Sequence, residues 1–199
     1  MSEFYGTPNE DESIATIHRA LELKEMCCVV QDSLGPVDVM VSNAGIAPSE
    51  SLEEISDSDW DRVMEVNLRP AFLLTRRLAL GMRERGWGRI VFVSSVAAFT
   101  GGVVGPHYTT SKAALIGLSH SLAASLAPHG VTVNAVAPAL IEGGATLPGG
   151  EEEHRKLAAN VQVGRLGTPE EVAQAVHAIV TNPFITAQTI SVDDGMYPR

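Results

Sequence analysis

At 199 residues, the chain is long enough to form one domain with a substantial core. Hydrophobic residues make up 45% and charged residues 19%, which is ordinary for a soluble globular protein. The formal net charge of −10 argues against nucleic acid or an anionic membrane surface as a partner, because both are negatively charged. No secretory signal pattern opens the chain and no apolar run reaches about 18 residues, so we expect a cytoplasmic protein that spans no membrane. Its two cysteines, Cys27 and Cys28, are neighbours and predict neither a disulfide framework nor a metal site.

The first elements in chain order are a leader, a helix and a strand. Residues 1–12 predict a flexible leader. Apolar residues then recur at helical spacing over residues 13–34, and Gly35 with Pro36 ends that helix. The apolar run at residues 37–41 predicts a buried parallel strand, which is followed by Asn43-Ala44-Gly45.

A longer helical region is predicted over residues 56–86. Ser56 or Asp57 is expected to cap it. Asn67 interrupts its apolar stripe, and an isolated buried amide is usually satisfied by nearby backbone groups. Pro70 should bend the helix, because proline removes a backbone donor and clashes with the preceding turn.

The next segment carries the residues with the clearest chemistry. The apolar run at residues 90–93 predicts a buried strand that delivers Ser95 at its end. A loop rich in glycine leads into a helix near residue 107, on which Tyr108 and Lys112 share one face. An ammonium beside a phenol favours the phenolate, so we expect Lys112 to lower the pKa of Tyr108. With a serine hydroxyl to hold a carbonyl oxygen, these are the parts for moving a proton while another group moves a hydride.

The rest of the chain continues the alternation of helices and strands. The helix from residue 107 runs to about residue 127, and strands are predicted at 131–136 and 188–192. Between them, residues 143–163 are rich in glycine and acid. Thr168 is expected to cap a further helix, with Pro169 at its first position.

Several of these features together resemble the short-chain dehydrogenase/reductase family, and most nearly its 3-oxoacyl-acyl-carrier-protein reductase type. The resemblance is carried by Ser95 before a Gly-rich loop, Tyr108 and Lys112 opening a helix, Asn43-Ala44-Gly45 after a strand, and Asn67 between them. It extends over roughly residues 20–197. It implies an α/β fold, with a doubly wound, Rossmann-like parallel sheet in a single domain over residues 1–199. It also implies that residues 143–163 form a substrate lid.

The resemblance also assigns roles to individual residues. It implies that Tyr108 is the general acid or base, that Lys112 lowers its pKa, that Ser95 positions the substrate oxygen, and that Asn67 helps to hold a water in a proton relay. The expected reaction transfers a hydride between NAD or NADP and a small-molecule carbonyl or secondary alcohol, with a 3-oxoacyl compound among the compatible substrates. The resemblance implies no metal. It implies a homo-oligomer, either a dimer or a tetramer. The expected cofactor-binding residues are Asn43, Ala44, Gly45, Tyr108, Lys112, Pro138, Ala139 and Ile141.

Four positions depart from the pattern of the family. Ala139 and Gly143 stand where the family usually has glycine and threonine, and Gly143 cannot supply the hydroxyl that contacts the nicotinamide amide. Ala187 and Asp194 stand where the family more often has glycine. Backbone contacts to a cofactor can survive the first two changes.

A larger departure lies ahead of residue 37, where no Gly-rich phosphate-binding turn occurs. We therefore expect an N-terminally truncated version of the fold, without the residue that selects NAD or NADP. The strand at 37–41 would then have an open apolar edge, covered by the amino-terminal segment, by another subunit or by nothing. The alternative to an active oxidoreductase is a catalytically silent relative that serves as an interaction or oligomer subunit.

Overall fold

The computed structural model describes residues 29–197 except 102–103, 145–146, 148 and 160. In this part of the chain, four parallel strands form one sheet with the order β1-β2-β3-β4. The strands are β1 (Val39–Ser42), β2 (Gly88–Val93), β3 (Val131–Pro138) and β4 (Thr189–Val192). Parallel neighbours need long crossover connections, and helices supply them here. The predicted α/β class is confirmed.

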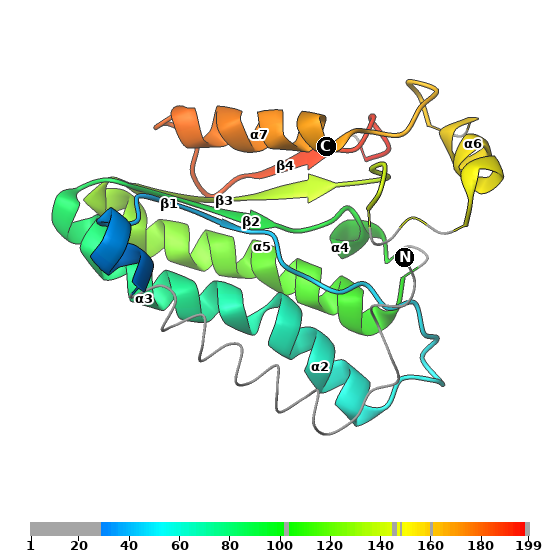
Figure 1. Ribbon diagram of the computed structural model, residues 1–199, viewed down its shortest axis with the longest axis horizontal. Coiled ribbons are helices and arrows are strands. Elements are labelled where there is room, and N and C mark those ends of the chain that lie inside the picture. The colour runs from blue at the N-terminus through cyan, green and yellow to red at the C-terminus, as the bar shows by residue number, and fades with distance from the viewer. Residues whose placement is uncertain (1–28, 102–103, 145–146, 148, 160, 198–199) are drawn as a thin grey trace.

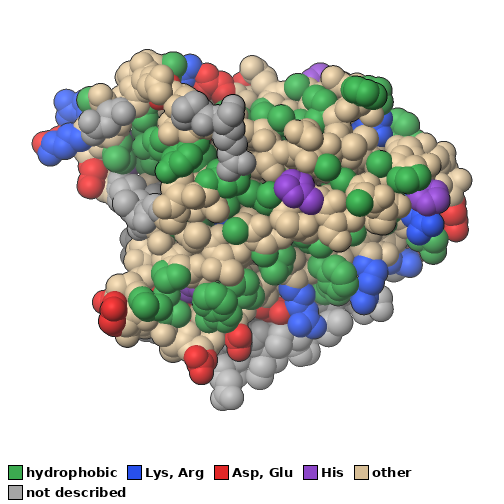
Figure 2. Space-filling view, turned by 180° about the vertical axis from the view of Figure 1, so that it is seen from behind, with side chains coloured by type: hydrophobic (Ala, Val, Ile, Leu, Met, Phe, Trp, Pro, Cys, Tyr) green, Lys and Arg blue, Asp and Glu red, His purple; other side chains and the backbone are tan. Residues whose placement is uncertain are grey.

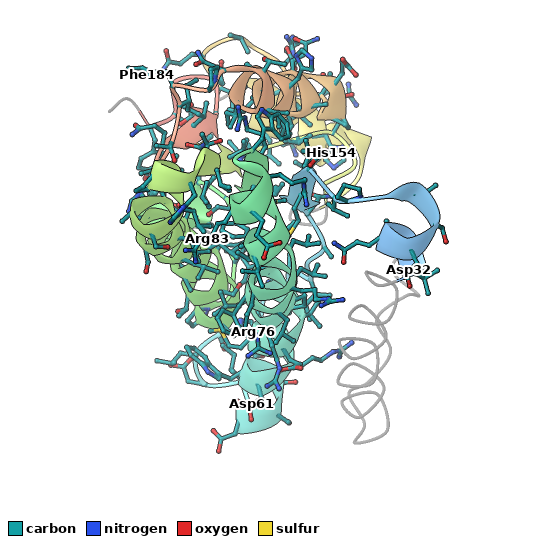
Figure 3. The ribbon with its side chains drawn as sticks, turned by 90° about the vertical axis from the view of Figure 1, so that its left-hand side faces the viewer. Asp32, Asp61, Arg76, Arg83, His154 and Phe184 are labelled. Atoms are coloured by element: carbon teal, nitrogen blue, oxygen red, sulfur yellow. The ribbon has the colours of Figure 1, made fainter. Side chains whose placement is uncertain are left out.

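Helices cover both faces of the sheet (Figure 1). One face carries α7 (Pro169–Thr181), and the other carries α3 (Arg69–Arg85) and α5 (Pro106–Leu126), with α2 (Asp57–Asn67) against α5. This two-sided cover is the predicted doubly wound arrangement. Figure 3 shows the layers end on, with Arg76 and Arg83 on the α3 layer and Phe184 on the α7 layer. The shorter helical segments are α4 (Ala97–Thr100), η1 (Ala127–His129), α6 (Glu151–Ala159) and residues 29–34.

Alternate residues of β2 supply two separate cores. Ile90 and Phe92 belong to the cluster on the side of α3 and α5. Val91, which lies between them, packs with Val136 and Ile179 beneath α7. Because both faces of the strand are buried, its sequence is a continuous apolar run, which is why the run predicted a buried strand.

Both predicted helix caps are present. Ser56 caps α2 through a reciprocal pair of hydrogen bonds, since Asp59 N–H donates to Ser56 Oγ at 3.2 Å and Ser56 N–H donates to Asp59 Oδ2 at 3.0 Å. Thr168 and Glu171 make the same arrangement at the start of α7, with Pro169 in the first turn. These caps fix the points at which the two helices begin.

The structure corrects three details of the predicted elements. The helical region at 56–86 is two helices and not one bent helix, because α2 ends at Asn67 and α3 begins beside Pro70. The first strand begins at Val39 and not at residue 37. A short helix, α4, occupies part of the predicted glycine-rich loop.

The described part of the first predicted helix agrees with its expected end. Residues 29–34 are helical, and Gly35 then adopts a positive φ of 88°. The leader at 1–12, the predicted helix up to residue 28 and both cysteines lie outside the described residues.

The outer edge of β1 is open in the described part of the chain. β1 pairs with β2 alone there, and Val39 and Val41 are 40% and 44% exposed. Met40 points to the opposite face and is buried. The expected open apolar edge is therefore present among the described residues. None of the described helices has the length and apolar character needed to cross a bilayer.

Candidate active site

A cavity of about 540 Å³ lies where the carboxyl ends of β1, β2 and β3 meet the first half of α5. Seen from behind, the molecule is hollowed at this end of the sheet (Figure 2). Eight of the ten predicted site residues line it, namely Asn43, Gly45, Ser95, Tyr108, Lys112, Pro138, Ala139 and Ile141. Ala44 is an exposed residue of the turn and is not among the lining residues, and Asn67 lies behind Gly45. In open parallel sheets, ligands bind outside the carboxyl ends of the strands, so this is the expected place for a site.

Tyr108 and Lys112 lie one turn apart on α5, and both are buried, at 6% and 4% exposure. Lys112 Nζ is 5.7 Å from the centroid of the Tyr108 ring. The same ammonium donates a hydrogen bond of 2.9 Å to the carbonyl oxygen of Val93, the last residue of β2. Burial lowers the pKa of Lys112 from 10.5 to about 8, because the charged form loses hydration.

Ser95 joins the tyrosine through a side-chain hydrogen bond. The Ser95 oxygen also accepts from the backbone N–H of Ala97 at 3.2 Å, which fixes the position of the hydroxyl. Burial raises the pKa of the Tyr108 phenol, and the bond to Ser95 opposes part of that rise. The expected net lowering of the phenol pKa is not found in this structure, because burial outweighs the groups that favour the phenolate.

Asn67 is held by three hydrogen bonds at the end of α2. Its Oδ1 accepts from Ile46 N–H at 2.8 Å, and its Nδ2 donates to the Ile46 carbonyl and to Ser111 Oγ, both at 2.9 Å. The amide thus fastens the loop after β1 to α5. A Cβ atom placed on Gly45 would lie 3.2 Å from both Asn67 Oδ1 and Lys112 Nζ. Asn67 and Lys112 therefore flank the same glycine, which keeps the space between them free of side-chain atoms.

The backbone after β3 forms the opposite wall of the cavity. Ala139 N–H donates to the Val192 carbonyl at 3.0 Å, and Glu142 N–H donates to the Gly167 carbonyl at 2.9 Å. Gly143, which has a positive φ of 69°, also lines the cavity. These contacts are made by backbone atoms, so the one at Ala139 does not depend on its side chain.

Comparison with known proteins gives one consistent answer. The family model described as Enoyl-(Acyl carrier protein) reductase matches residues 16–197. The 3-oxoacyl-[acyl-carrier-protein] reductase of Aquifex aeolicus is 43% identical over 163 residues, which are 81% of this chain and 66% of that protein. The chain belongs to the short-chain dehydrogenase/reductase family.

Two solved structures agree with this assignment. A 3-oxoacyl-[acyl-carrier protein] reductase from Brucella melitensis superposes with a TM-score of 0.79 at 36% identity, and 86% of this chain matches 67% of that one. A second 3-oxoacyl-[acyl-carrier protein] reductase structure from the same species, with bound NAD, gives a TM-score of 0.76 at 36% identity. The match covers 86% of this chain and 66% of that one. This chain thus spans about two thirds of the length of these reductases. The relatives support the predicted oxidoreductase class and a nicotinamide cofactor.

The cavity fits the nicotinamide end of such a cofactor. Its volume is within the range of about 300–1,000 Å³ typical of small-molecule sites. Gly45 leaves the space beside Lys112 free of side-chain atoms, and Tyr108 and Lys112 line the same cavity. The described residues supply no comparable site for the pyrophosphate, because β1 leads into a loop and then into α2, whose first turn carries Asp57 and Asp59.

The structure also adds residues that the sequence reasoning missed. Val172 and Val176 of α7 form part of the cavity wall, as does Glu142. The spacing of Val172 and Val176 marks a buried helix face, but it carries no information about which part of that face overhangs the site. In the described residues, no group of three histidine, cysteine or acidic side chains gathers as metal ligands would.

Proposed function

We propose that this chain is an oxidoreductase that transfers a hydride between NADP or NAD and a carbonyl or secondary alcohol. The observation that supports this most directly is the buried hydrogen bond between Ser95 and Tyr108, beside Lys112 and in front of the cavity. A hydroxyl pair next to a cation can hold a carbonyl oxygen and exchange a proton with it.

In the direction of reduction, each of these residues has a distinct task. When bound, the reduced nicotinamide supplies the hydride. Ser95 donates a hydrogen bond to the carbonyl oxygen, which orients it. Tyr108, kept protonated by burial, gives its proton to that oxygen as negative charge develops there. Lys112 stabilises the phenolate that remains, because it is still mostly protonated at pH 7 with a pKa of about 8.

For Asn67, we propose a supporting role in returning a proton to the site. Its amide holds the loop at Ile46 and lies beside Lys112 across Gly45. A water near the Ile46 carbonyl would lie on the path between the ammonium and solvent. This assignment rests on the matching asparagine of the family together with that position.

A 3-oxoacyl thioester is the substrate class that we propose. The relatives named above are 3-oxoacyl-[acyl-carrier-protein] reductases. The wall formed by Val93, Ile141 and Val176 is apolar and suits an acyl chain. We propose that residues 143–163, which include α6, close over the substrate as a lid. We further propose that the chain forms a single domain and that the protein works in the cytoplasm.

The test is a titration of the purified chain with NADPH and with NADH, followed by nicotinamide fluorescence and by melting temperature. We expect micromolar binding of at least one cofactor, about 8 kcal/mol of binding free energy, and a raised melting temperature. Addition of acetoacetyl-coenzyme A should then oxidise the bound NADPH or NADH. Absence of binding by both cofactors would reject the stand-alone enzyme.

That negative result would favour the second candidate, a catalytically silent subunit. One observation supports this candidate, namely that residues 1–36 contain no Gly-rich phosphate-binding motif. Such a subunit would act within an assembly and not on a substrate.

We also propose that the chain forms a homo-oligomer, either a dimer or a tetramer, through α3. Phe72 and Leu80 on this helix are 45% and 61% exposed, and Arg76 lies over the Phe72 ring at 5.4 Å. Leu80→Glu should lower the sedimentation coefficient of an oligomer. Leu52→Glu, which changes a 73% exposed leucine in a loop, is the matched control and should leave it unchanged.

A further inference from the structure

His107 is a fully buried histidine that takes no part in the reaction proposed above. Its Nδ1 accepts a hydrogen bond of 3.0 Å from the backbone N–H of Tyr108. Its Nε2 lies 3.3 Å from Oε2 of Glu50, in the loop between β1 and α2. The imidazole therefore lies between Tyr108, the proposed proton donor, and the β1–α2 loop, which forms one wall of the cavity.

The bond from Tyr108 fills a gap at the start of α5. The first N–H groups of a helix have no partner within the helix, and a side chain at the preceding residue usually accepts one of them. Here that residue is Gly105, which has no side chain, and Pro106 follows it. His107 Nδ1 supplies the missing acceptor for the N–H of Tyr108.

The contacts with Tyr108 and Glu50 together define which nitrogen of the ring carries the proton. A nitrogen that accepts a hydrogen bond is unprotonated, so the neutral ring carries its proton on Nε2. That nitrogen lies 3.3 Å from Glu50 Oε2, at ion-pair distance, and neither atom makes a hydrogen bond within the described residues. The carboxylate thus favours the tautomer that leaves Nδ1 free to accept from Tyr108.

The glycine at position 105 is required by the same arrangement. A Cβ atom there would lie 2.4 Å from Cε1 of His107 and 3.0 Å from the Glu50 carbonyl oxygen. Gly105 N–H also donates to the Pro48 carbonyl at 3.3 Å. Two chain segments far apart in the sequence are therefore joined directly at the turn that presents Tyr108.

We propose that His107 and Glu50 are positioning residues for Tyr108. By fixing the first turn of α5 against the β1–α2 loop, they set the position of the phenol relative to Ser95. Only the kinetic part of the test rests on the proposed function.

Two substitutions of His107 separate its two contacts. Asparagine places its Oδ1 near the position of Nδ1. His107→Asn therefore keeps the acceptor for Tyr108 N–H and loses the contact with Glu50. Glutamine places its amide nitrogen near Nε2, so His107→Gln keeps the contact with Glu50 and loses that acceptor. We expect kcat for acetoacetyl-coenzyme A reduction to fall by about tenfold or more in His107→Gln and by about threefold or less in His107→Asn, with KM little changed in both. Equal kcat values, or an effect on KM alone, would overturn the proposal.

Glu50 offers a second pair of variants at a partly exposed position. Glu50→Gln retains an acceptor for Nε2–H and should keep nearly full kcat. Glu50→Ala removes it and should lower kcat by several-fold. A purely structural role predicts instead that both change melting temperature and leave kcat alone.

A measurement on the unmodified chain is independent of turnover. Nitrogen-15 spectra of the histidine side chains should show that the neutral His107 ring carries its proton on Nε2 and not on Nδ1, and Glu50→Ala should give a mixture of tautomers. Protonation at Nδ1 would overturn the proposal even if the chain reduces carbonyls. The expected tautomer in a chain that binds no nicotinamide would uphold the contact and reject only the proposed function.

Discussion

Lys112 on α5 donates a hydrogen bond of 2.9 Å to the carbonyl oxygen of Val93 at the end of β2. This contact holds the ammonium at the end of the sheet and away from water, and burial lowers its pKa to about 8. Lys112 therefore loses its proton at a pH well below 10.5, the ordinary pKa of a lysine.

The first prediction concerns the dependence of reduction on pH. Below about pH 8 Lys112 is charged and stabilises the phenolate, whereas above it the charge disappears. We expect kcat for reduction to fall by about tenfold for each pH unit above about 8. Lys112→Met should abolish this limb together with most of the activity. A flat profile up to pH 10 would show that the lysine charge takes no part.

The second prediction concerns the tyrosine itself. Tyr108→Phe removes the proton donor and leaves the ring packing, so kcat should fall by about 10²–10⁴-fold with little change in melting temperature. Tyr197→Phe, a change of the same kind at a tyrosine that is 36% exposed, is the matched control. Equal activity of the two variants would place the acid elsewhere.

The third prediction concerns the glycine between Asn67 and Lys112. Gly45→Ala places a methyl group 3.2 Å from both polar atoms, so one of them must move. We expect weaker nicotinamide binding and at least about tenfold lower kcat/KM. Gly117→Ala, on α5 where a Cβ meets nothing within 4 Å, should leave both unchanged. Unchanged binding in Gly45→Ala would show that the cofactor approaches from another side.

The fourth prediction concerns backbone strain at Ala187, whose φ is 57°. Glycine adopts this conformation without a steric penalty, so Ala187→Gly should raise the free energy of unfolding by about 0.5–1 kcal/mol, after the greater freedom of the unfolded chain is counted. Ala187→Val should lower it by about 1–2 kcal/mol, because a β-branched residue tolerates positive φ poorly. Urea unfolding measures both, and the same sign for the two changes would contradict the explanation.

Asp194 provides the contrast, since its φ of 61° is compensated by contacts. Its carboxylate accepts from the backbone N–H of Gln162 and from that of Val163, the latter at 2.6 Å. Asp194→Gly should therefore lower the stability of residues 161–163 despite the relief of strain. Hydrogen exchange at those amides is the measurement.

The sequence predicted those parts of the site that depend on chain order and local spacing. Ser95, Tyr108 and Lys112 were expected to converge because one follows a strand and the others share a helix face, and the structure brings them together. The direction of the pKa of Tyr108 was not predictable in this way, because it depends on how completely other segments bury the phenol.

Contacts between distant segments were also beyond local patterns. His107 and Glu50 belong to no shared motif, and they meet only because the loop after β1 folds over the start of α5. The same holds for Val172 and Val176, whose spacing showed a buried face but not the cavity beside it.

Among the described residues, the order of the strands across the sheet is also their order along the chain. During synthesis, each of these strands therefore finds the neighbour that precedes it already made, and the sheet can grow at one side without rearrangement. The wall carried by α7 is the last part of the cavity to leave the ribosome. The emerging chain therefore contains Ser95, Tyr108 and Lys112 before it contains the helix that completes the cavity wall.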